Sequence, residues 1–431
     1  MQGSLDAPRR TPFISGLNTV VAALGRAGLV RTAALEKSAL MASARAASGG
    51  LEDFGDGWFN EPLDRLLAAL PDARLNTAGL IAAEKTLVHL LRDRLLARDW
   101  LRRHPEIAAR PIRRPVVIVG PMRSGTTRLH RLLAGDRRFA HLRSFETISP
   151  VPRPGFEAVL EGRARDFRPV LASRILKVAR LANPRTLSIH PTGPFEPEEE
   201  LGLLAASFYG MKFEAQWQIP SYARWCEEAD ARPAYRHMAD LLRIVGWSQQ
   251  ESSLRPWILK TPQHMLDLPA LLDVFPDARL IFTHRDPCAV VGSAASLAWN
   301  QTVIYSDHAR PEVVGREWLR KTDVMTRRMM AARRAIPADR IIDVHYDAVE
   351  RDWRATMERV YRFLDLDLEP ALPAMETYIA RSAGMKRRPH RYSLAQYGLS
   401  EGAVRERLAP YVRAFDVPLE EGAGTLLRRK A

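Results

Sequence analysis

The stretch Arg114-Pro-Val-Val-Ile-Val-Gly-Pro-Met-Arg-Ser-Gly-Thr-Thr-Arg-Leu-His130 decides the fold of this chain. The apolar run Val116–Val119 is typical of a buried strand, and it leads into a Gly-Pro turn. A Ser-Gly-Thr-Thr segment follows, and then a helical pattern over Arg128–Ala134. A strand, a glycine-containing loop and a helix N-terminus in this order direct successive backbone N–H groups at an anion. The sequence therefore predicts a phosphate-binding loop.

This loop departs from the nucleoside-triphosphatase form, G-x-x-x-x-G-K-S/T. Gly120 and Gly125 keep the spacing, but Thr126 stands where that form requires lysine. The cation of the loop comes earlier, at Arg123. A P-loop kinase or another nucleotide-binding enzyme stays as the alternative interpretation, although no Walker-B aspartate is evident.

The bulk composition limits the classes of protein to consider. The chain has 431 residues, 46% of them hydrophobic, and a net charge of +14. Such a basic balance suits an anionic ligand, nucleic acid or an anionic membrane surface, but also solvated surface arginines. The basic residues are dispersed and form no recognised nucleic-acid module, so we expect no nucleic-acid partner. Cys226 and Cys288 fit no disulfide framework or metal pattern, which favours a cytoplasmic location.

The sequence predicts no transmembrane segment, because it contains no run of 18 or more apolar residues. The run Val20-Val-Ala-Ala-Leu-Gly follows Arg9 and Arg10 but is too short and interrupted for a signal peptide. It is compatible with a helix that packs on the core or with peripheral membrane contact, and we favour core packing. No feature of the sequence indicates an oligomeric state.

The pattern along the chain predicts an α/β fold with a central parallel sheet, a helical N-terminal extension and a helical insertion. Strands are expected at Val116–Val119, Trp257–Leu259, Arg279–His284 and Ile341–Val344. We divide the chain as follows: an extension over 1–50, and a single domain over 51–431 with a helical lead-in (51–114), an α/β core (115–150 and 255–415) and a helical insertion on the acceptor side (155–250).

A second constellation lies in the segment Thr283–Ser293. A strand delivers Arg285 at its carboxyl end, and Ser293 follows about two helical turns later. An arginine fork and a hydroxyl so placed could hold one phosphate together. An Arg-Asp pair at a strand end is, however, also common as a structural salt bridge.

Together these two segments resemble the superfamily of sulfotransferases that use 3′-phosphoadenosine-5′-phosphosulfate (PAPS). The closer match is to the bacterial branch related to tyrosylprotein sulfotransferases, where arginine replaces the usual loop lysine. The resemblance covers residues 51–415. It is also carried by Leu51–Asp56, Arg102–Glu106, Trp257–His264 and His390–Leu394.

The resemblance implies which residues bind PAPS. These are Arg123, Ser124, Gly125, Thr126 and Thr127 at the 5′-phosphosulfate, Arg285 and Ser293 at the 3′-phosphate, and Tyr346, Lys386 and Arg388 near the nucleotide. The animal cytosolic enzymes carry an R-K-G-x-x-G-x-W signature where this chain has Gly384–Arg391. Which of Lys386, Arg387 and Arg388 contacts the nucleotide therefore stays open.

The resemblance also implies the catalytic residues: Arg123 and Lys260 at the transferred group, and Glu146 as the general base. Phe145 precedes this glutamate where the family usually has tryptophan. A strand or extended segment is expected around Glu146, and aromatic burial would raise the proton affinity of its carboxylate. His130, His264 and His284 are the rival bases; we expect His130 to face the core and His284 to bond the sheet backbone.

The implied reaction transfers a sulfuryl group to a hydroxyl, less readily an amine, and needs no metal because cationic groups already lie at the leaving group. Steroid, quinol, lipid alcohol, sugar, phenol and peptide tyrosine all stay open as acceptors, with a small or lipid-like alcohol favoured. The acidic stretch Glu196–Glu200 could line the acceptor pocket, but we favour a helix start there. Six aromatics suit either a lid or a helical core: Phe208, Tyr209, Phe213, Trp217, Tyr222 and Trp225.

Overall fold

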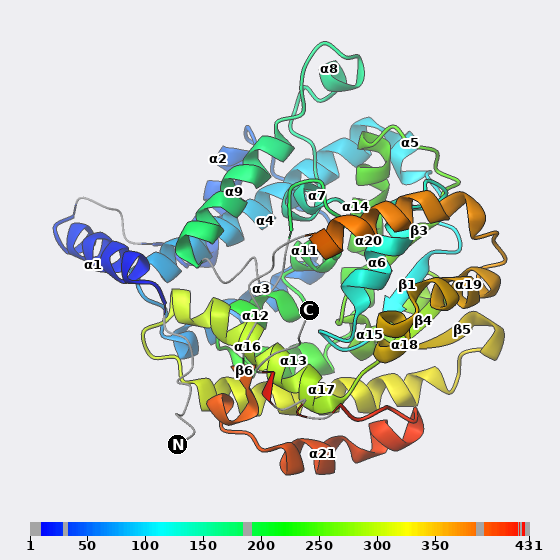
Figure 1. Ribbon diagram of the computed structural model, residues 1–431. Helices are drawn as coiled ribbons and strands as arrows, with labels where there is room; N and C mark the ends of the chain where they lie inside the picture. The colour runs from blue at the N-terminus through cyan, green and yellow to red at the C-terminus, as the bar shows by residue number, and fades with distance from the viewer. Residues whose placement is uncertain are drawn as a thin grey trace.

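The structure is a computed structural model that describes residues 10–28, 33–183, 192–384, 392–420, 422 and 425–426. Its centre is a five-stranded sheet in the order β2-β3-β1-β4-β5, and every pair of neighbouring strands in it is parallel (Figure 1). The strands are β1 (Val116–Val119), β2 (Ala140–His141), β3 (Trp257–Lys260), β4 (Arg279–His284) and β5 (Ile341–His345). This confirms the predicted α/β fold with a central parallel sheet. The sequence pattern does not reveal β2, which is only two residues long.

Helices surround the sheet. The segment before β1 forms α1 (Pro12–Arg26), α2 (Lys37–Ala47), α3 (Asn60–Ala69), α4 (Thr77–Arg103) and α5 (Pro105–Ala108). Between β1 and β3 lie α6 (Thr126–Ala134), α7 (Ser144–Ile148), α8 (Glu157–Leu160), α9 (Arg168–Ala182), α11 (Leu201–Ala205), α12 (Met211–Gln216), α13 (Pro220–Glu228) and α14 (Arg232–Ser248). After β3 come α15 (His264–Val274), α16 (Pro287–Tyr305), α17 (Pro311–Arg333), α18 (Tyr346–Arg351), α19 (Trp353–Phe363), α20 (Leu372–Gly384) and α21 (Glu401–Ala414), with a small antiparallel pair, β6 (Tyr392–Ser393) and β7 (Thr425–Leu426).

The three central strands β3, β1 and β4 are buried on both faces of the sheet, which explains their nearly continuous apolar sequences, whereas the edge strand β5 is only partly buried. Alternate residues of β1 point to opposite faces. Val117 and Val119 join a core shared with the long helices α4, α14 and α16. Val116 and Ile118 join a second core beneath α6, α19 and α20. The residues that follow the carboxyl ends of these strands are therefore the ones that leave the buried core.

Helix α1 lies apart from the sheet, on the left of Figure 1. It packs against α4 and buries Ile14, but no residue of Val20–Gly25, the run for which we favoured core packing, is buried. Val20 and Leu24 are exposed on the same helix. Among the described helices, none is long and apolar enough to cross a membrane.

The described residues between β2 and β3 form helices and no strand, and their aromatics build a core rather than a lid. Phe208, Tyr209, Phe213, Trp217 and Tyr222 are all buried. Phe213 stacks on Trp217 with ring centroids 5.7 Å apart, and it meets Tyr222 edge-on at 6.0 Å. Of the two interpretations that the sequence left open, the structure supports the core.

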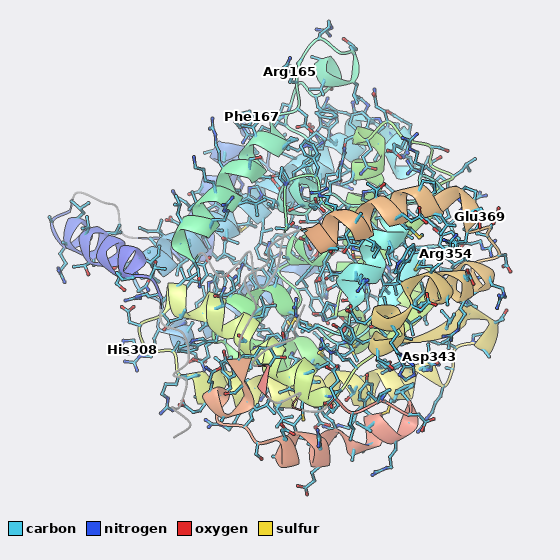
Figure 2. All side chains as sticks on the ribbon, in the orientation of Figure 1. Arg165, Phe167, His308, Asp343, Arg354 and Glu369 are labelled. Atoms are coloured by element: carbon cyan, nitrogen blue, oxygen red, sulfur yellow. The ribbon has the colours of Figure 1, made fainter. Side chains whose placement is uncertain are left out.

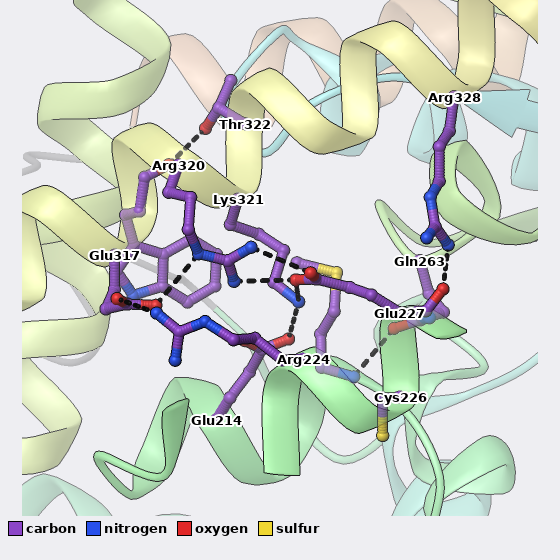
Figure 3. A network of polar contacts seen from close by, with 12 residues as sticks. Glu214, Arg224, Cys226, Glu227, Gln263, Glu317, Arg320, Lys321, Thr322 and Arg328 are labelled. Atoms are coloured by element: carbon purple, nitrogen blue, oxygen red, sulfur yellow. Dashed lines mark hydrogen bonds and ion pairs between the residues drawn. The ribbon is translucent and has the colours of Figure 1, made fainter. Parts of the chain in front are cut away.

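A buried charge network fastens this helical segment to α17 (Figure 3). Lys321 on α17 lies 2.8 Å from Glu214 of α12 and 2.6 Å from Glu227 of α13. Arg320 donates to both oxygens of Glu227 at 2.8 Å. Burial raises the pKa of Glu227, but the hydrogen bonds from Arg320 and the charge of Lys321 outweigh burial and lower it to about 2. The two cations of α17 thus favour the ionised form of Glu227, whereas burial outweighs the charge of Lys321 at Glu214 and raises the pKa of that carboxyl.

Removing the central cation should destabilise the fold. Lys321→Met keeps the side-chain volume but leaves Glu214 and Glu227 buried with less compensation, which typically costs about 3–5 kcal/mol. Arg327→Met is the matched control, because Arg327 pairs with Asp323 on the same helix with its side chain 60% exposed; such pairs contribute about 0–1 kcal/mol. Chemical denaturation measures both, and equal midpoints would remove this network from the interactions that stabilise the fold.

Candidate active site

The loop after β1 has the backbone geometry of an anion cradle. Arg123 and Gly125 adopt left-handed conformations, with φ of 71° and 86°. Alternation of such residues with right-handed ones turns successive N–H groups to one side. Helix α6 begins at Thr126, two residues earlier than its apolar pattern indicates. Thr126 and Thr127 therefore lie in its first turn, where backbone N–H groups have no acceptor within the helix.

Gly120 allows this loop to lie against β4. A Cβ at this position would be 2.0 Å from Oγ1 of Thr283 and 2.9 Å from its carbonyl oxygen. Ser124 donates to the carbonyl of Pro121 at 2.8 Å and lies 2.7 Å from the Thr283 hydroxyl. The Ser124 side chain, predicted at the nucleotide, thus braces the loop from within and is buried.

Arg285 directly follows β4, and it contacts the segments that follow β1 and β5 at the carboxyl edge of the sheet. Its guanidinium carbon lies 3.8 Å from the ring centroid of Tyr346, at the end of β5. Its Nη1 donates to the carbonyl oxygen of Arg123 at 2.8 Å. The Tyr346 ring in turn lies against Gly125, where a Cβ would approach it to 2.8 Å. The structure therefore brings Arg123, Arg285 and Tyr346 together, as their predicted roles require.

The side of the Arg285 guanidinium that does not face Arg123 binds a carboxylate. Its Nε and Nη2 donate to the two oxygens of Glu420, at 2.7 and 3.1 Å. Burial alone would lower the pKa of Arg285, but these bonds outweigh burial and raise it, so the guanidinium stays charged. Glu420 lies in the segment after α21, and no pattern in the sequence singled it out.

Ser293 on α16 meets a different arginine from the one that the sequence paired with it. Its hydroxyl accepts from Nε of Arg123 at 3.1 Å. Tyr392 on β6 lies close by; burial raises its pKa to about 12, although Arg285 and Arg123 oppose this rise. Tyr392 was part of the segment that carries the resemblance, but we assigned it no role there.

Lys260 ends β3, next to β1, and its side chain is only 1% exposed. Its ammonium bonds the carboxylate of Glu199, and its backbone N–H donates to Glu200 at 3.0 Å. The other oxygen of Glu200 lies 2.5 Å from Nε2 of His264. The favoured interpretation of Glu196–Glu200 as a helix start is therefore incomplete. Glu200 stands at the start of α11, but its side chain caps no backbone N–H there.

Glu146 lies in α7, so the expected strand or extended segment is wrong; the two-residue β2 precedes it instead. Its carboxylate accepts from the backbone N–H of Arg143 at 2.8 Å and pairs with the guanidinium of the same residue. Nε2 of Gln249 donates to its two oxygens at 3.1 and 3.0 Å. Glu146 is fully buried. Among the described residues its polar partners are Arg143 and Gln249.

The three histidines are buried in different surroundings. Burial, and then the charges of Lys260 and His141, hold the pKa of His130 well below its usual value. Neither ring nitrogen of His130 has a hydrogen-bond partner among the described residues. His284 lies 2.8 Å from Asp343 and 3.2 Å from the Tyr411 hydroxyl, so the expected bond to the sheet backbone is wrong.

Two predicted residues, Lys386 and Arg388, lie outside the described residues. Within the described part of the chain, no group of three His, Cys, Asp or Glu side chains could hold a metal ion. The described cations of the site come from three adjacent strands: Lys260 from β3, Arg123 from the loop after β1, and Arg285 from β4.

Comparison with known proteins identifies the family of this chain. The model of the sulfotransferase family matches residues 115–370, and the chain belongs to this family. Two of its solved relatives are mycobacterial. The sulfotransferase STF1 of Mycobacterium tuberculosis is 30% identical, with a TM-score of 0.76 over 88% of this chain and 100% of that chain. The sulfotransferase STF9 of Mycobacterium avium is 25% identical, with a TM-score of 0.77 over 91% and 99%.

A third relative has a named acceptor. The omega-hydroxy-beta-dihydromenaquinone-9 sulfotransferase of Mycobacterium bovis is 26% identical over 295 residues, 65% of this chain and 71% of that protein. These relatives confirm that the chain is an enzyme of the PAPS-dependent sulfotransferase superfamily.

The packing at Gly120 gives a test of the site that needs no ligand. Gly120→Ala would force a methyl group into Thr283, and such overpacking typically costs about 1–3 kcal/mol. Gly402→Ala on α21 is the control, because a Cβ there meets nothing within 4 Å; we expect no loss. Thermal unfolding compares the two, and an unaltered Gly120→Ala protein would mean that the loop does not lie against β4.

Proposed function

We propose that this chain transfers a sulfuryl group from PAPS to a hydroxyl of a small or lipid-like acceptor. One observation carries the proposal: Lys260, the Arg123 loop and Arg285 leave the carboxyl ends of three adjacent strands, β3, β1 and β4. Ligands of open α/β sheets bind at this edge. A cytoplasmic location is part of the same proposal.

The residues present fit a nucleotide with two phosphate groups. The cradle after β1 closes against β4 and β5 at Gly120 and Gly125, where side chains would not fit. The Arg285 fork already binds a two-oxygen anion in Glu420, the geometry in which arginine binds phosphate. We assign the cradle and Arg123 to the 5′-phosphosulfate. We assign Arg285 and Ser293 to the 3′-phosphate, although the Ser293 hydroxyl now accepts a hydrogen bond from Arg123. The Tyr346 ring, which stacks on the Arg285 guanidinium, would orient it.

PAPS supplies the sulfuryl group, and the protein supplies charge and a base. Arg123, Lys260 and the first turn of α6 would stabilise negative charge as it grows on the leaving oxygen. Removal of one such donor typically costs ~10²–10³ in rate. Because Lys260 is almost fully buried, its charge acts where water screens it little.

Two carboxylates compete for the role of general base. Glu146, which the resemblance implies, is fully buried and held by Arg143 and Gln249. Glu199 pairs with Lys260, and its side chain is 21% exposed. A base must come within hydrogen-bond reach of the acceptor proton. These contacts favour Glu199, which Lys260 would release on turning to the transferred group, and they give Glu146 the work of positioning α7.

The nature of the acceptor follows from the relatives and from the surface. The Mycobacterium bovis relative is named for a menaquinone carrying an omega-hydroxyl, a lipid alcohol. Phe195, a few residues before Glu199, is 60% exposed and lies edge-on to Phe145 with centroids 5.8 Å apart. An exposed aromatic that packs on the neighbour of Glu146 and lies four residues before Glu199 in the chain supports an apolar acceptor.

The nucleotide site can be tested without an acceptor. Calorimetric titration with 3′-phosphoadenosine-5′-phosphate should show affinity that Arg285→Ala weakens by about 2–3 kcal/mol, on the order of 30–150-fold. Glu420→Gln should tighten binding, because the charged competitor for the Arg285 fork is gone. Arg232→Ala, which removes a half-exposed arginine paired with Asp230, serves as the control. Tighter, magnesium-dependent binding of ATP would overturn the proposal in favour of a kinase.

The base can be tested by two matched amides, with PAPS and a panel of phenols and long-chain alcohols. Glu199→Gln should lower kcat by ~10² or more with nucleotide affinity nearly unchanged. Glu146→Gln should lower the unfolding midpoint and change kcat much less than Glu199→Gln does, because it weakens the contacts of Glu146 to Arg143 and Gln249. A large loss of kcat in Glu146→Gln at unchanged stability would return the base to Glu146.

A further inference from the structure

Helix α9 carries a row of apolar side chains that nothing in the described structure covers. Val178 and Leu181 are 65% and 57% exposed. Phe167 just before the helix, and Val170 and Ile175 on it, are 42–45% exposed. At 100° per residue all five fall within an arc of about 140°, so they form one face. A run of large apolar side chains on one face marks an interaction site, unlike single exposed ones.

The opposite side of α9 explains why the helix stands in this position. Ala172 is buried, and α9 packs on α7, which carries Glu146. Arg168 donates to the carbonyl of Pro150 and the hydroxyl of Ser248, each at 3.2 Å. The helix is thus anchored to the body of the enzyme through one side, and its apolar side chains are exposed; Figure 1 shows α9 at the upper left of the molecule.

The charge around this face is strongly positive. Residues 161–182 contain six basic and two acidic residues; Glu161 pairs with Arg163, and Asp166 pairs with the buried Arg168. Arg165, Lys177 and Arg180 are exposed and form no ion pair with a described residue. Figure 2 shows Arg165 at the projecting tip of the molecule and Phe167 just below it.

The start of helix α1 lies beside the end of α9. The hydroxyl of Thr11, its N-cap residue, donates to the carbonyl of Ala182 at the end of α9, at 3.3 Å. Val20 and Leu24 are exposed on α1, and residues 10–28 contain no acidic side chain. Exposed apolar side chains with basic residues near them in the chain are therefore present on α9 and on the neighbouring α1.

We infer that the face formed by α9 and α1 docks on an anionic lipid bilayer. An amphipathic helix with basic flanks lies in the membrane interface, where apolar burial and attraction to acidic headgroups both contribute. A second copy of this chain would place two basic surfaces against each other, so the charge disfavours a dimer. The docking stands on this surface alone. Its purpose, to deliver a lipid-like acceptor to the carboxylates beside α7, rests on the proposed function.

The experiment is flotation of the full chain with vesicles of phosphatidylcholine alone or mixed equally with phosphatidylglycerol. We expect binding to the mixed vesicles, weakened by high salt. Val178→Glu combined with Leu181→Glu, and Lys177→Glu combined with Arg180→Glu, should each lower the partition coefficient by about 10-fold or more. Leu254→Glu is the matched control, because Leu254 is 72% exposed outside both helices; it should bind like the wild type.

Two further results would overturn the inference: equal binding of the wild type and both double variants, or a dimer in ultracentrifugation that Val178→Glu with Leu181→Glu dissolves. Calorimetry with 3′-phosphoadenosine-5′-phosphate on the same variants should be unchanged. Calorimetry separates the two proposals. If the wild type does not bind the nucleotide, the proposed sulfotransferase mechanism is contradicted, while vesicle binding still tests the membrane inference by itself.

Discussion

The close contact of Gly120 with Thr283 is the constraint on which the site depends. It brings the loop after β1 against the end of β4 with no room for a side chain. Arg285, two residues beyond Thr283, can then reach the Arg123 carbonyl and lie over the Tyr346 ring. The close packing of the loop on β4 thereby fixes the relative positions of Arg123, Arg285 and Tyr346. The aliphatic cores on the two faces of the sheet hold the strands in place.

Much of this arrangement could be predicted from the sequence, because it follows from local pattern. Continuous apolar runs gave four of the five strands of the central sheet, and the spacing of Gly120, Arg123 and Gly125 gave the loop. The carboxyl ends of parallel strands meet at one edge, so Lys260 and Arg285 could be brought to the loop without knowledge of the tertiary structure. Two-residue β2 carries no such periodicity.

Contacts made by residues far apart in the chain could not be predicted in the same way. Glu199 reaches Lys260 and Glu420 reaches Arg285 from segments without a regular pattern. Glu146 shows the opposite difficulty: its sequence context is informative, but its partner Gln249 comes from the end of α14 and could not be foreseen. In a chain with so many arginines, each carboxylate has many possible ion-pair partners, and the tertiary structure determines which of them lies within reach.

The pairing of Arg285 with Glu420 has a consequence for how this protein handles anions. Under the proposed function, a phosphate that binds Arg285 must displace the Glu420 carboxylate, so its binding is an exchange rather than a simple addition. A tethered carboxylate competes at the effective concentration that its linkage sets, commonly millimolar for a short flexible connection. Any apparent affinity for a phosphate-bearing ligand is then a net value, and release of a spent ligand is assisted by a replacement that is always at hand.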